Sequence, residues 1–305
     1  MERILSKELD LWKSHYNNGM RHLFTEEPYF TAEFKNIWMK DKDDHILEEL
    51  INDFKGTFFQ SPYFQAFYKN IKICCPETVF HGTDIGHKYY ATGARFKKYL
   101  EDHALTHTDQ YKLTLEAIDQ GARFYDGEDG IYRENQMARN FIRELKSING
   151  ADVMGIYGGT HVRPGGKDAD GAVINMLEQI KLKYGPSIQV TNLAYPDKLS
   201  SPIRVDQISI NGKMYSASYY GKVNWRGFKN IDFNEYWRLE GAYSDLASSK
   251  KINSTMEYDE FPMAIEKGQV IIEDVVTSDK KVYRSIYRTD GTLLNGQPVA
   301  EELSL

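Results

Sequence analysis

The sequence is poor in cysteine and in long apolar segments. Its only two cysteines, Cys74 and Cys75, are adjacent in a chain of 305 residues. Adjacent cysteines are too close for an unstrained disulfide, so no disulfide framework holds this fold, and a reducing compartment fits this usage. The chain also lacks an uninterrupted run of about 18 apolar residues and the apolar core of a signal peptide. As it stands, the sequence predicts a cytoplasmic protein without membrane insertion.

An excess of basic residues is missing as well. The 38 Lys and Arg residues are outnumbered by 44 Asp and Glu residues, which gives a formal net charge of −6. Nucleic-acid-binding proteins usually carry a basic surface, so this balance argues against a general nucleic-acid binder. Only nine residues are proline, and 41% of the residues are hydrophobic against 27% charged. This composition is typical of a globular protein and excludes extensive disorder.

Several catalytic motifs are absent. The chain contains no Gly-x-Ser-x-Gly elbow and no Gly-x-x-x-x-Gly-Lys-Ser/Thr loop, and Gly155, Gly158 and Gly159 miss the dinucleotide-binding spacing. These absences argue against a serine hydrolase, a P-loop enzyme and a conventional NAD enzyme. The two thiols precede the second predicted strand, so a cysteine nucleophile is not expected. Water activated by a histidine or by a metal ion is the chemistry that remains.

The sequence does contain a repeated order of short apolar strands, polar strand ends and amphipathic helices. Strands are predicted at 20–26, 78–80, 153–157 and 189–193, with helices between them. This order predicts an α/β fold with a mostly parallel central sheet and helices on both faces.

A change of pattern after residue 194 predicts a second domain. Residues 1–194 form the predicted α/β domain, and residues 195–305 form a small antiparallel β-rich module with one helix. Within the module, Asn211-Gly212 predicts a hairpin, because both residues accept the positive φ angles of a type I′ turn. Residues 236–246 predict the helix, and residues 270–287 predict two paired strands.

Ionisable side chains follow three of the predicted strands. Glu26 ends the first, His81 and Asp84 end the second, and His161 follows the third. The carboxyl ends of parallel strands converge on one crevice, where carboxylate and imidazole groups suit proton transfer or metal binding. Glu26 is equally placed to cap the next helix. The spacing His81-x-x-Asp84-x-x-His87 is compatible with metal ligation but is not the His-Glu-x-x-His zinc motif.

Glycines precede the late histidine. Gly158 and Gly159 permit close backbone approach, which favours a site role for His161 over a place in the core. Residues 163–171 follow directly and have the composition of a lid, although the same composition is typical of a linker.

A predicted helix over 131–146 carries a second polar group. Arg133, Met137 and Asn140 share one side of this helix, since residues at i, i+4 and i+7 are neighbours. This side is suited to bracing a site. An exposed ion pair between Arg133 and Asp129 explains the same pattern, and both interpretations stay open.

Four segments together resemble the erythromycin esterase/ChaN/Tiki superfamily, which includes TraB-like proteins. The resemblance covers about residues 7–165 and is carried by Arg21–Glu26, His81–Asp84, Tyr132–Asn140 and Gly155–His161. It implies an α/β fold in which an early Gly-Glu-x-His strand, a second strand-end Glu and a late strand-end His build one site. An Arg-Asp/Glu-x-x-Met-x-x-Asn helix supports that site.

The resemblance implies roles for individual residues. The implied catalytic residues are Glu26, Arg133, Glu134 and His161. Asn140 falls on the last position of the helix motif and is a candidate substrate-binding residue, together with His81, Asp84 and Tyr157 at the predicted strand ends. His81 and His161 are the candidate metal ligands.

The early Gly-Glu-x-His strand has no counterpart in this sequence. Two explanations stay open: Met1 is an internal start in a longer reading frame, or the protein is a divergent member that has lost part of its catalytic set. The first explanation also allows an export signal upstream, so an exported or surface-attached protein is the alternative to a cytoplasmic one.

Members of the superfamily include esterases, metal-dependent proteases and haem-handling proteins, so the resemblance implies a site more than a substrate. We expect a hydrolase of the esterase or peptidase class that uses Glu26 and His161 to activate water. A divalent metal ion is either required or not involved, and the substrate is a small molecule or a peptide. The alternative is a ligand-binding or scaffold protein without catalytic activity. The sequence does not define the oligomeric state.

Overall fold

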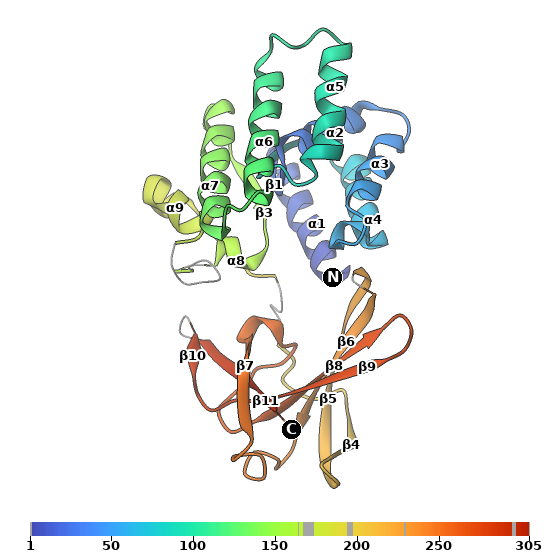
Figure 1. Cartoon of the computed structure of the whole chain (residues 1–305), viewed down its shortest axis with the longest axis vertical. Helices are drawn as coiled ribbons and strands as arrows, with labels where there is room; N and C mark the ends of the chain where they lie inside the picture. The colour runs from blue at the N-terminus through green and yellow to red at the C-terminus, as the bar shows by residue number, and fades with distance from the viewer. Residues whose placement is uncertain are drawn as a thin grey trace. The chain divides into compact units, whose positions relative to one another are not determined.

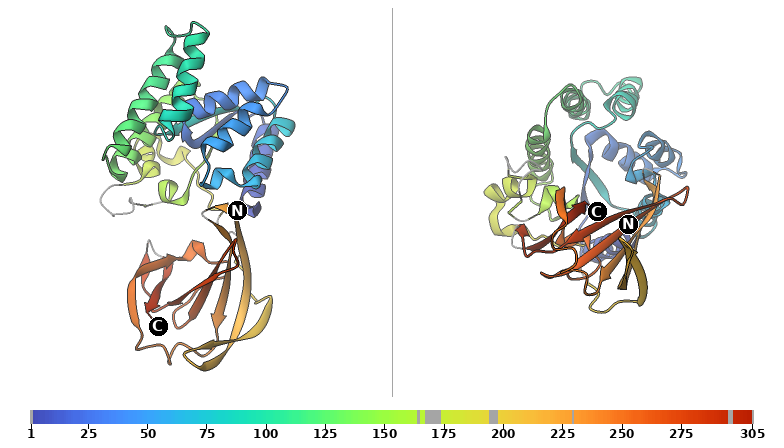
Figure 2. Two further views of the ribbon diagram at one scale, coloured as in Figure 1. Left: turned by 45° about the vertical axis from the view of Figure 1, so that its right-hand side comes forward. Right: turned by 60° about the horizontal axis from the view of Figure 1, so that its bottom comes forward.

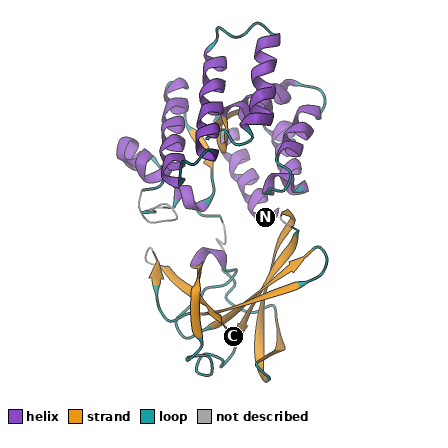
Figure 3. Ribbon diagram, in the orientation of Figure 1, coloured by secondary structure: helices purple, strands orange, loops and turns teal. Residues whose placement is uncertain are grey.

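The computed structural model describes residues 2–163, 165–166, 174–193, 198–228, 230–294 and 297–304 (Figure 1). The chain forms two compact units. The N-terminal unit comprises Leu5–Lys55 and Pro62–Thr191, and the C-terminal unit comprises Asn192–Leu305 with the short segments Met1–Ile4 and Gly56–Ser61. The first unit is mainly helical and the second is built from strands (Figure 3).

The predicted fold class is wrong. The parallel sheet has three strands in the order β2-β1-β3, formed by β1 (His22–Pro28), β2 (Val79–Asp84) and β3 (Val153–Ile156). The larger sheet of the described chain is antiparallel and has eight strands. The predicted strand at 189–193 is irregular chain, so the parallel sheet does not extend past β3 in the described residues. β3 is an edge strand, and it is only partly buried although its sequence is apolar.

Helices cover both faces of the small parallel sheet. The α-helices are α1 (Glu2–Asn17), α2 (Tyr29–Lys40), α3 (His45–Asp53), α4 (Pro62–Cys74), α5 (Ala94–Asp102), α6 (Asp109–Tyr125), α7 (Gly130–Ser147), α8 (Gly159–Val162) and α9 (Met176–Tyr184), and a π-helical turn spans Tyr89–Gly93. On one face of β1, Phe24 packs on Phe141 of α7. On the other, Glu27 contacts Lys35 of α2 and Tyr68 of α4. This alternation follows from the two-residue period of a strand.

The C-terminal unit is one strongly twisted antiparallel sheet (Figure 2). Its strands are β4 (Arg204–Ile210), β5 (Lys213–Phe228), β6 (Ile231–Leu239), β7 (Lys250–Glu257), β8 (Val270–Thr277), β9 (Val282–Arg288), β10 (Leu293–Leu294) and β11 (Gln297–Ser304). The predicted hairpin is confirmed, with positive φ at Asn211 and Gly212 between β4 and β5. The predicted pairing of β8 with β9 is also confirmed.

The helix predicted at 236–246 is wrong, because its first residues belong to β6 and the rest form turns. Trp237 and Leu239 pack in one apolar cluster, whereas Tyr236 packs in a second cluster. Tyr243 and Leu246 in the following turns pack on the same cluster as Leu239. Their spacing of three and four residues is also that of one face of a helix, which is why the sequence predicted a helix.

No helix within the described residues combines the length and the apolar character needed to span a membrane.

Two glycines bring α6 against the loop that follows β2. A Cβ atom on Gly121 would lie 2.1 Å from the carbonyl oxygen of Gly86, and one on Gly86 would lie 2.0 Å from that of Ala117. Any side chain at either position would push the two backbones apart. The contact therefore sets the position of the end of α6 relative to the loop after Asp84.

Gly121→Ala is expected to lower the free energy of unfolding by about 1–3 kcal/mol, because the added methyl group overpacks this contact. Urea-induced unfolding measures the change. Gly130→Ala is the matched control, since a Cβ atom at this position meets nothing within 4 Å. Equal stability of the two variants would contradict the interpretation.

A buried ion pair lies on the face of β1 that is opposite Phe24. Lys35 and Glu27 are 3% and 2% exposed, and the Lys35 ammonium contacts Oε1 of Glu27. The Tyr68 hydroxyl donates a hydrogen bond of 2.5 Å to the same oxygen. Burial lowers the pKa of Lys35 to about 8, and the Glu27 carboxylate opposes that shift.

Lys35→Met is expected to lower the free energy of unfolding by about 3–5 kcal/mol at neutral pH, because it leaves a buried carboxylate without its cation. Lys98→Met is the control, since Lys98 is 71% exposed in its pair with Asp102 and such pairs contribute about 0–1 kcal/mol. Thermal and urea unfolding of both variants gives the comparison. A loss no larger than that of the control would show that the pair is not important for stability.

Candidate functional site

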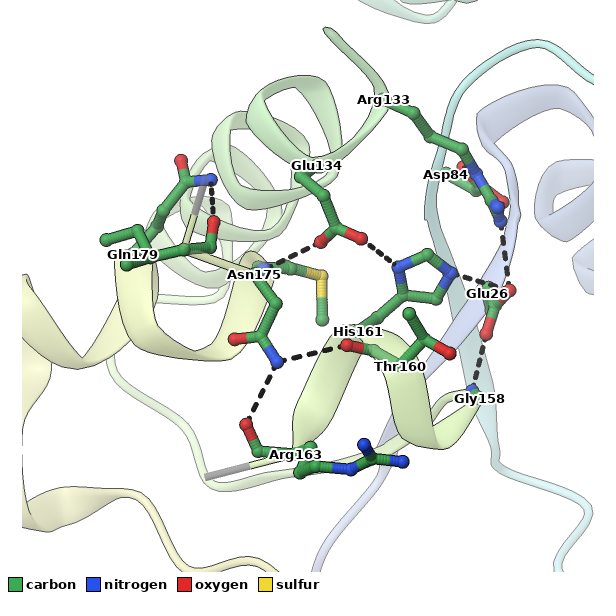
Figure 4. Close-up of polar contacts among 12 residues, drawn as sticks. Glu26, Asp84, Arg133, Glu134, Gly158, Thr160, His161, Arg163, Asn175 and Gln179 are labelled. Atoms are coloured by element: carbon green, nitrogen blue, oxygen red, sulfur yellow. Dashed lines mark hydrogen bonds and ion pairs between the residues drawn. The ribbon is translucent and has the colours of Figure 1, made fainter. Parts of the chain in front are cut away.

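The ends of the parallel strands bring distant parts of the sequence together. Thr25 of the central strand β1 pairs with Gly82 of β2 and with Ile156 of β3. The residues that follow these positions therefore lie at one edge of the sheet. Glu26 and Asp84 occupy this edge, and the turn after β3 leads directly into α8, which carries the third predicted side chain of the site (Figure 4).

Arg133 joins the ends of β1 and β2. Its Nε and Nη2 donate to the two oxygens of Asp84 at 3.0 and 2.7 Å, and Nη2 also donates to Oε1 of Glu26 at 2.9 Å (Figure 4). Arg133 lies in the first turn of α7, where the Asp129 carboxylate accepts a hydrogen bond from the Tyr132 N–H at 3.0 Å. The helix cap and the forked pairing together fix the guanidinium between the strands.

His161 lies between two carboxylates. Its Nδ1 is 2.6 Å from Oε1 of Glu134, and its Nε2 is 3.4 Å from Oε1 of Glu26. Glu134 is held in turn by the backbone N–H of Met176, which donates to its Oε2 at 2.7 Å. The side chain of Glu26 is 26% exposed, against 10% for His161. Of the two residues in the Glu26–His161 contact, Glu26 is therefore the one that solvent or a ligand reaches more easily.

The surroundings of these groups favour ionised forms at neutral pH. Burial opposes the charge of His161, but the hydrogen bonds with Glu134 and Glu26 outweigh it and raise the pKa of His161 to about 9. Burial likewise opposes the charge of Glu26, yet the contact with His161 and the charge of Arg133 lower its pKa below the ordinary value. Burial of Asp84 is outweighed by the charges of Arg133 and His87, which hold its pKa well below its usual range.

The backbone between β3 and α8 also contributes. The N–H of Gly158 donates to Oε2 of Glu26 at 2.5 Å, and a Cβ atom on Gly158 would lie only 3.1 Å from that oxygen. The side chain of Asn175 donates to the carbonyl oxygens of Thr160 and Arg163 at 3.0 and 2.9 Å. Asn175 thus fixes the turn that carries His161. The sequence did not reveal this residue, because its partners in the turn are backbone atoms.

The structure also tests two alternative interpretations, a helix cap for Glu26 and an exposed ion pair with Asp129 for Arg133. Pro28 occupies the N-cap position of α2, and no side chain caps that helix, so Glu26 is not a helix cap. Asp129 caps the start of α7, while Arg133 pairs with Asp84 and Glu26. The polar side of the α7 helix therefore braces the strand ends.

Two further predicted site residues lie close to the charged group. Asn140 donates to the backbone oxygen of Asp84 at 3.4 Å and exchanges hydrogen bonds with Gln120. The Tyr157 hydroxyl is 2.7 Å from Oγ1 of Thr83. Both support the ends of the strands. Of the predicted lid at 163–171, residues 164 and 167–171 lie outside the described residues.

The structure places His81 in a different polar group. Its Nε2 is 3.0 Å from Nδ1 of His22, its Nδ1 is 3.2 Å from Glu144, and its ring stacks on Phe24. His81 and Asp84 lie on an extended strand, in which three residues span about 10 Å. The spacing that suggested metal ligation therefore separates His81 and Asp84 along the strand.

The described residues do not bring the candidate metal ligands His81 and His161 together. Among the residues that the structure describes, no three or more His, Cys, Asp and Glu side chains are grouped to hold a metal ion. His81 and His161 have different partners, and both ring nitrogens of His161 face carboxylates. The side chains of His161 and its two carboxylate partners are therefore candidates for acid–base chemistry.

Comparisons of the chain with protein-family models, with curated proteins and with solved structures give no match. The superfamily resemblance accordingly stays a hypothesis, and function is inferred from the geometry and charge of the site.

Glu134→Gln is expected to lower the pKa of His161 from about 9 toward its ordinary value of 6.5, because the variant removes the carboxylate that faces Nδ1. The pH titration of the His161 ring carbons by NMR measures the shift. Glu48→Gln, at an exposed position of α3, is the control and is expected to leave the titration unchanged. An unchanged or higher pKa in Glu134→Gln would contradict the assignment.

Proposed function

We propose that this site hydrolyses an ester- or amide-type bond in a small molecule or a peptide. The observation that carries the proposal is the 3.4 Å contact between Nε2 of His161 and Oε1 of Glu26. Glu134 and Arg133 orient the two groups from opposite sides. A carboxylate and an imidazolium that are held together in this way, one of them partly exposed, supply both partners of acid–base catalysis.

The charges assign a role to each side chain. At neutral pH the imidazolium of His161, with a pKa of about 9, is a proton donor, and the Glu26 carboxylate is a proton acceptor. Water attacks the carbonyl carbon and gives its proton to Glu26, while Nε2 of His161 protonates the leaving group. Transfer of the proton from Glu26 to Nε2 restores the ion pair. His161 is the acid in this assignment, whereas the sequence predicted that it activates water or binds a metal ion.

Arg133 supports this chemistry by electrostatics. Its guanidinium neutralises part of the charge of Glu26 and Asp84, and its side chain is 22% exposed beside Glu26. A cation at this position also stabilises negative charge that develops on a carbonyl oxygen.

A second function, ligand binding without catalysis, is favoured by one observation. Each charged side chain of the site already has an oppositely charged partner within the described residues, from Asp84 through Arg133, Glu26 and His161 to Glu134. Such a closed network is able to hold the strand ends in one arrangement without taking part in a reaction.

His161→Gln and Glu26→Gln are each expected to reduce hydrolysis by about 10²–10⁴-fold, because each removes one partner of proton transfer. The rates are measured with a panel of carboxylic esters, lactones and short peptides, and circular dichroism checks that the fold is intact. His103→Gln, at an exposed histidine that ends α5, is the matched control. No hydrolysis of any panel member by the native protein, or native rates in both variants, would favour ligand binding alone.

The pH profile gives an independent readout in the same assay. Activity is expected to fall at low pH as Glu26 takes up a proton and to fall above about pH 9 as His161 loses one. Glu134→Gln should move the alkaline limb to lower pH.

A further inference from the structure

Two exposed tyrosines lie beside the charged site. Tyr125, the last residue of α6, and Tyr90, in the π-helical turn, are 57% and 65% exposed. Tyr89 links them, with ring centres 5.5 Å from Tyr90 and 6.3 Å from Tyr125. We call these three residues the tyrosine shelf. Rings of this size are usually buried, and grouped exposed aromatic rings are typical of binding surfaces.

A chain of short polar contacts joins the tyrosine shelf to the site. The Tyr125 hydroxyl is 2.7 Å from Nδ1 of His87, and Nε2 of His87 is 3.2 Å from Oδ2 of Asp84. The same carboxylate is paired with Arg133, which contacts Glu26. The shelf is therefore four contacts away from the carboxylate that we propose as the base.

The ring of Tyr125 is exposed, but its contacts restrict its motion. The backbone contact of Gly121 with Gly86 fixes the last turn of α6, and Tyr125 lies one turn after Gly121 on the same side of the helix. His87 holds the hydroxyl, and the Phe124 ring lies 6.2 Å from the His87 ring in an edge-to-face arrangement. Because the contacts of Tyr125 already restrict its motion, a ligand would pay little additional ordering entropy to use its ring face.

The backbone under Tyr89 and Tyr90 has an unusual conformation. The π-helical turn Tyr89–Gly93 begins directly after Lys88, which has a φ of 59°. Single π-helical turns often occur at functional sites, because they rotate side chains out of the regular helical pattern. Here the turn presents Tyr90 to solvent while Thr92 and Gly93 stay buried.

The charge of the site narrows the chemistry of its ligand. Three carboxyl groups, those of Glu26, Asp84 and Glu134, face two cationic groups, those of Arg133 and His161. An additional anion is therefore disfavoured. We propose that the tyrosine shelf binds an uncharged aromatic ring of the substrate and thereby places its scissile bond at Glu26 and His161. This inference names a substrate class for the proposed hydrolase and rests on that function.

Binding without turnover tests the shelf itself. Benzamide is expected to shift the ring resonances of Tyr125 and Tyr90 in NMR spectra of protein labelled at tyrosine, whereas acetamide, which lacks the ring, is not. Tyr125→Ala and Tyr90→Ala should each weaken benzamide binding by about tenfold, in line with the contribution of one aromatic contact. Tyr283→Ala, a 59% exposed tyrosine of the C-terminal unit, is the matched control. The proposal is overturned if benzamide causes no shift, or if both shelf variants bind it as the native protein does.

Two further measurements separate the shelf from the catalytic proposal. His161→Gln should retain benzamide binding, since His161 is not part of the shelf. In the hydrolysis assay, Tyr125→Ala should lower the ratio of kcat/KM for methyl phenylacetate to that for methyl propionate by about tenfold, and Tyr283→Ala should leave the ratio unchanged. Benzamide binding without any hydrolysis would refute the hydrolase and support the ring site. Hydrolysis with an unchanged ratio in Tyr125→Ala would refute the ring site alone.

Discussion

The guanidinium of Arg133 is the charge on which the arrangement of the site depends. It contacts the carboxylates of Glu26 and Asp84, which belong to neighbouring strands and would otherwise repel each other. Two carboxylates at such close range stay ionised together only when a cation lies between them. With Asp84 occupied by Arg133, Glu26 remains available to His161. The contact between Glu26 and His161 is therefore a consequence of the way α7 approaches the ends of two parallel strands.

The alternation of side chains along β1 connects this site with the stability of the unit. Phe24 and Glu26 face α7, while Glu27 faces Lys35 and Tyr68 on the other side of the sheet. The buried carboxylate of Glu27 and the partly exposed carboxylate of Glu26 thus belong to adjacent residues of one strand. Any shift of register in β1 would break the contacts of both, so the geometry of the site is linked to the packing of the core.

The sequence predicted which side chains meet at the strand ends better than it predicted the fold around them. Glu26, Asp84, Arg133 and His161 were identified because they follow strands or open a helix, and parallel strands bring such positions to one edge. The strand β6 was missed, because Leu239, Tyr243 and Leu246 are three or four residues apart, which is also the spacing of one face of a helix. Asn175 and Tyr125 were missed for another reason. Asn175 binds backbone carbonyl oxygens, and Tyr125 depends on a backbone contact between glycines far apart in the sequence.

The π-helical turn Tyr89–Gly93 has a consequence for variation in length. A π turn is equivalent to one residue inserted in an α-helix, and it leads without a break into α5. Deleting one residue from the later part of the turn would restore regular helical winding and rotate Tyr89 and Tyr90, its first two residues, by about 100° around the helix axis. The direction in which Tyr90 points is thus encoded by the number of residues in the turn as much as by their identity. Homologous chains that differ by a single deletion here would present a different surface beside the same charged strand ends.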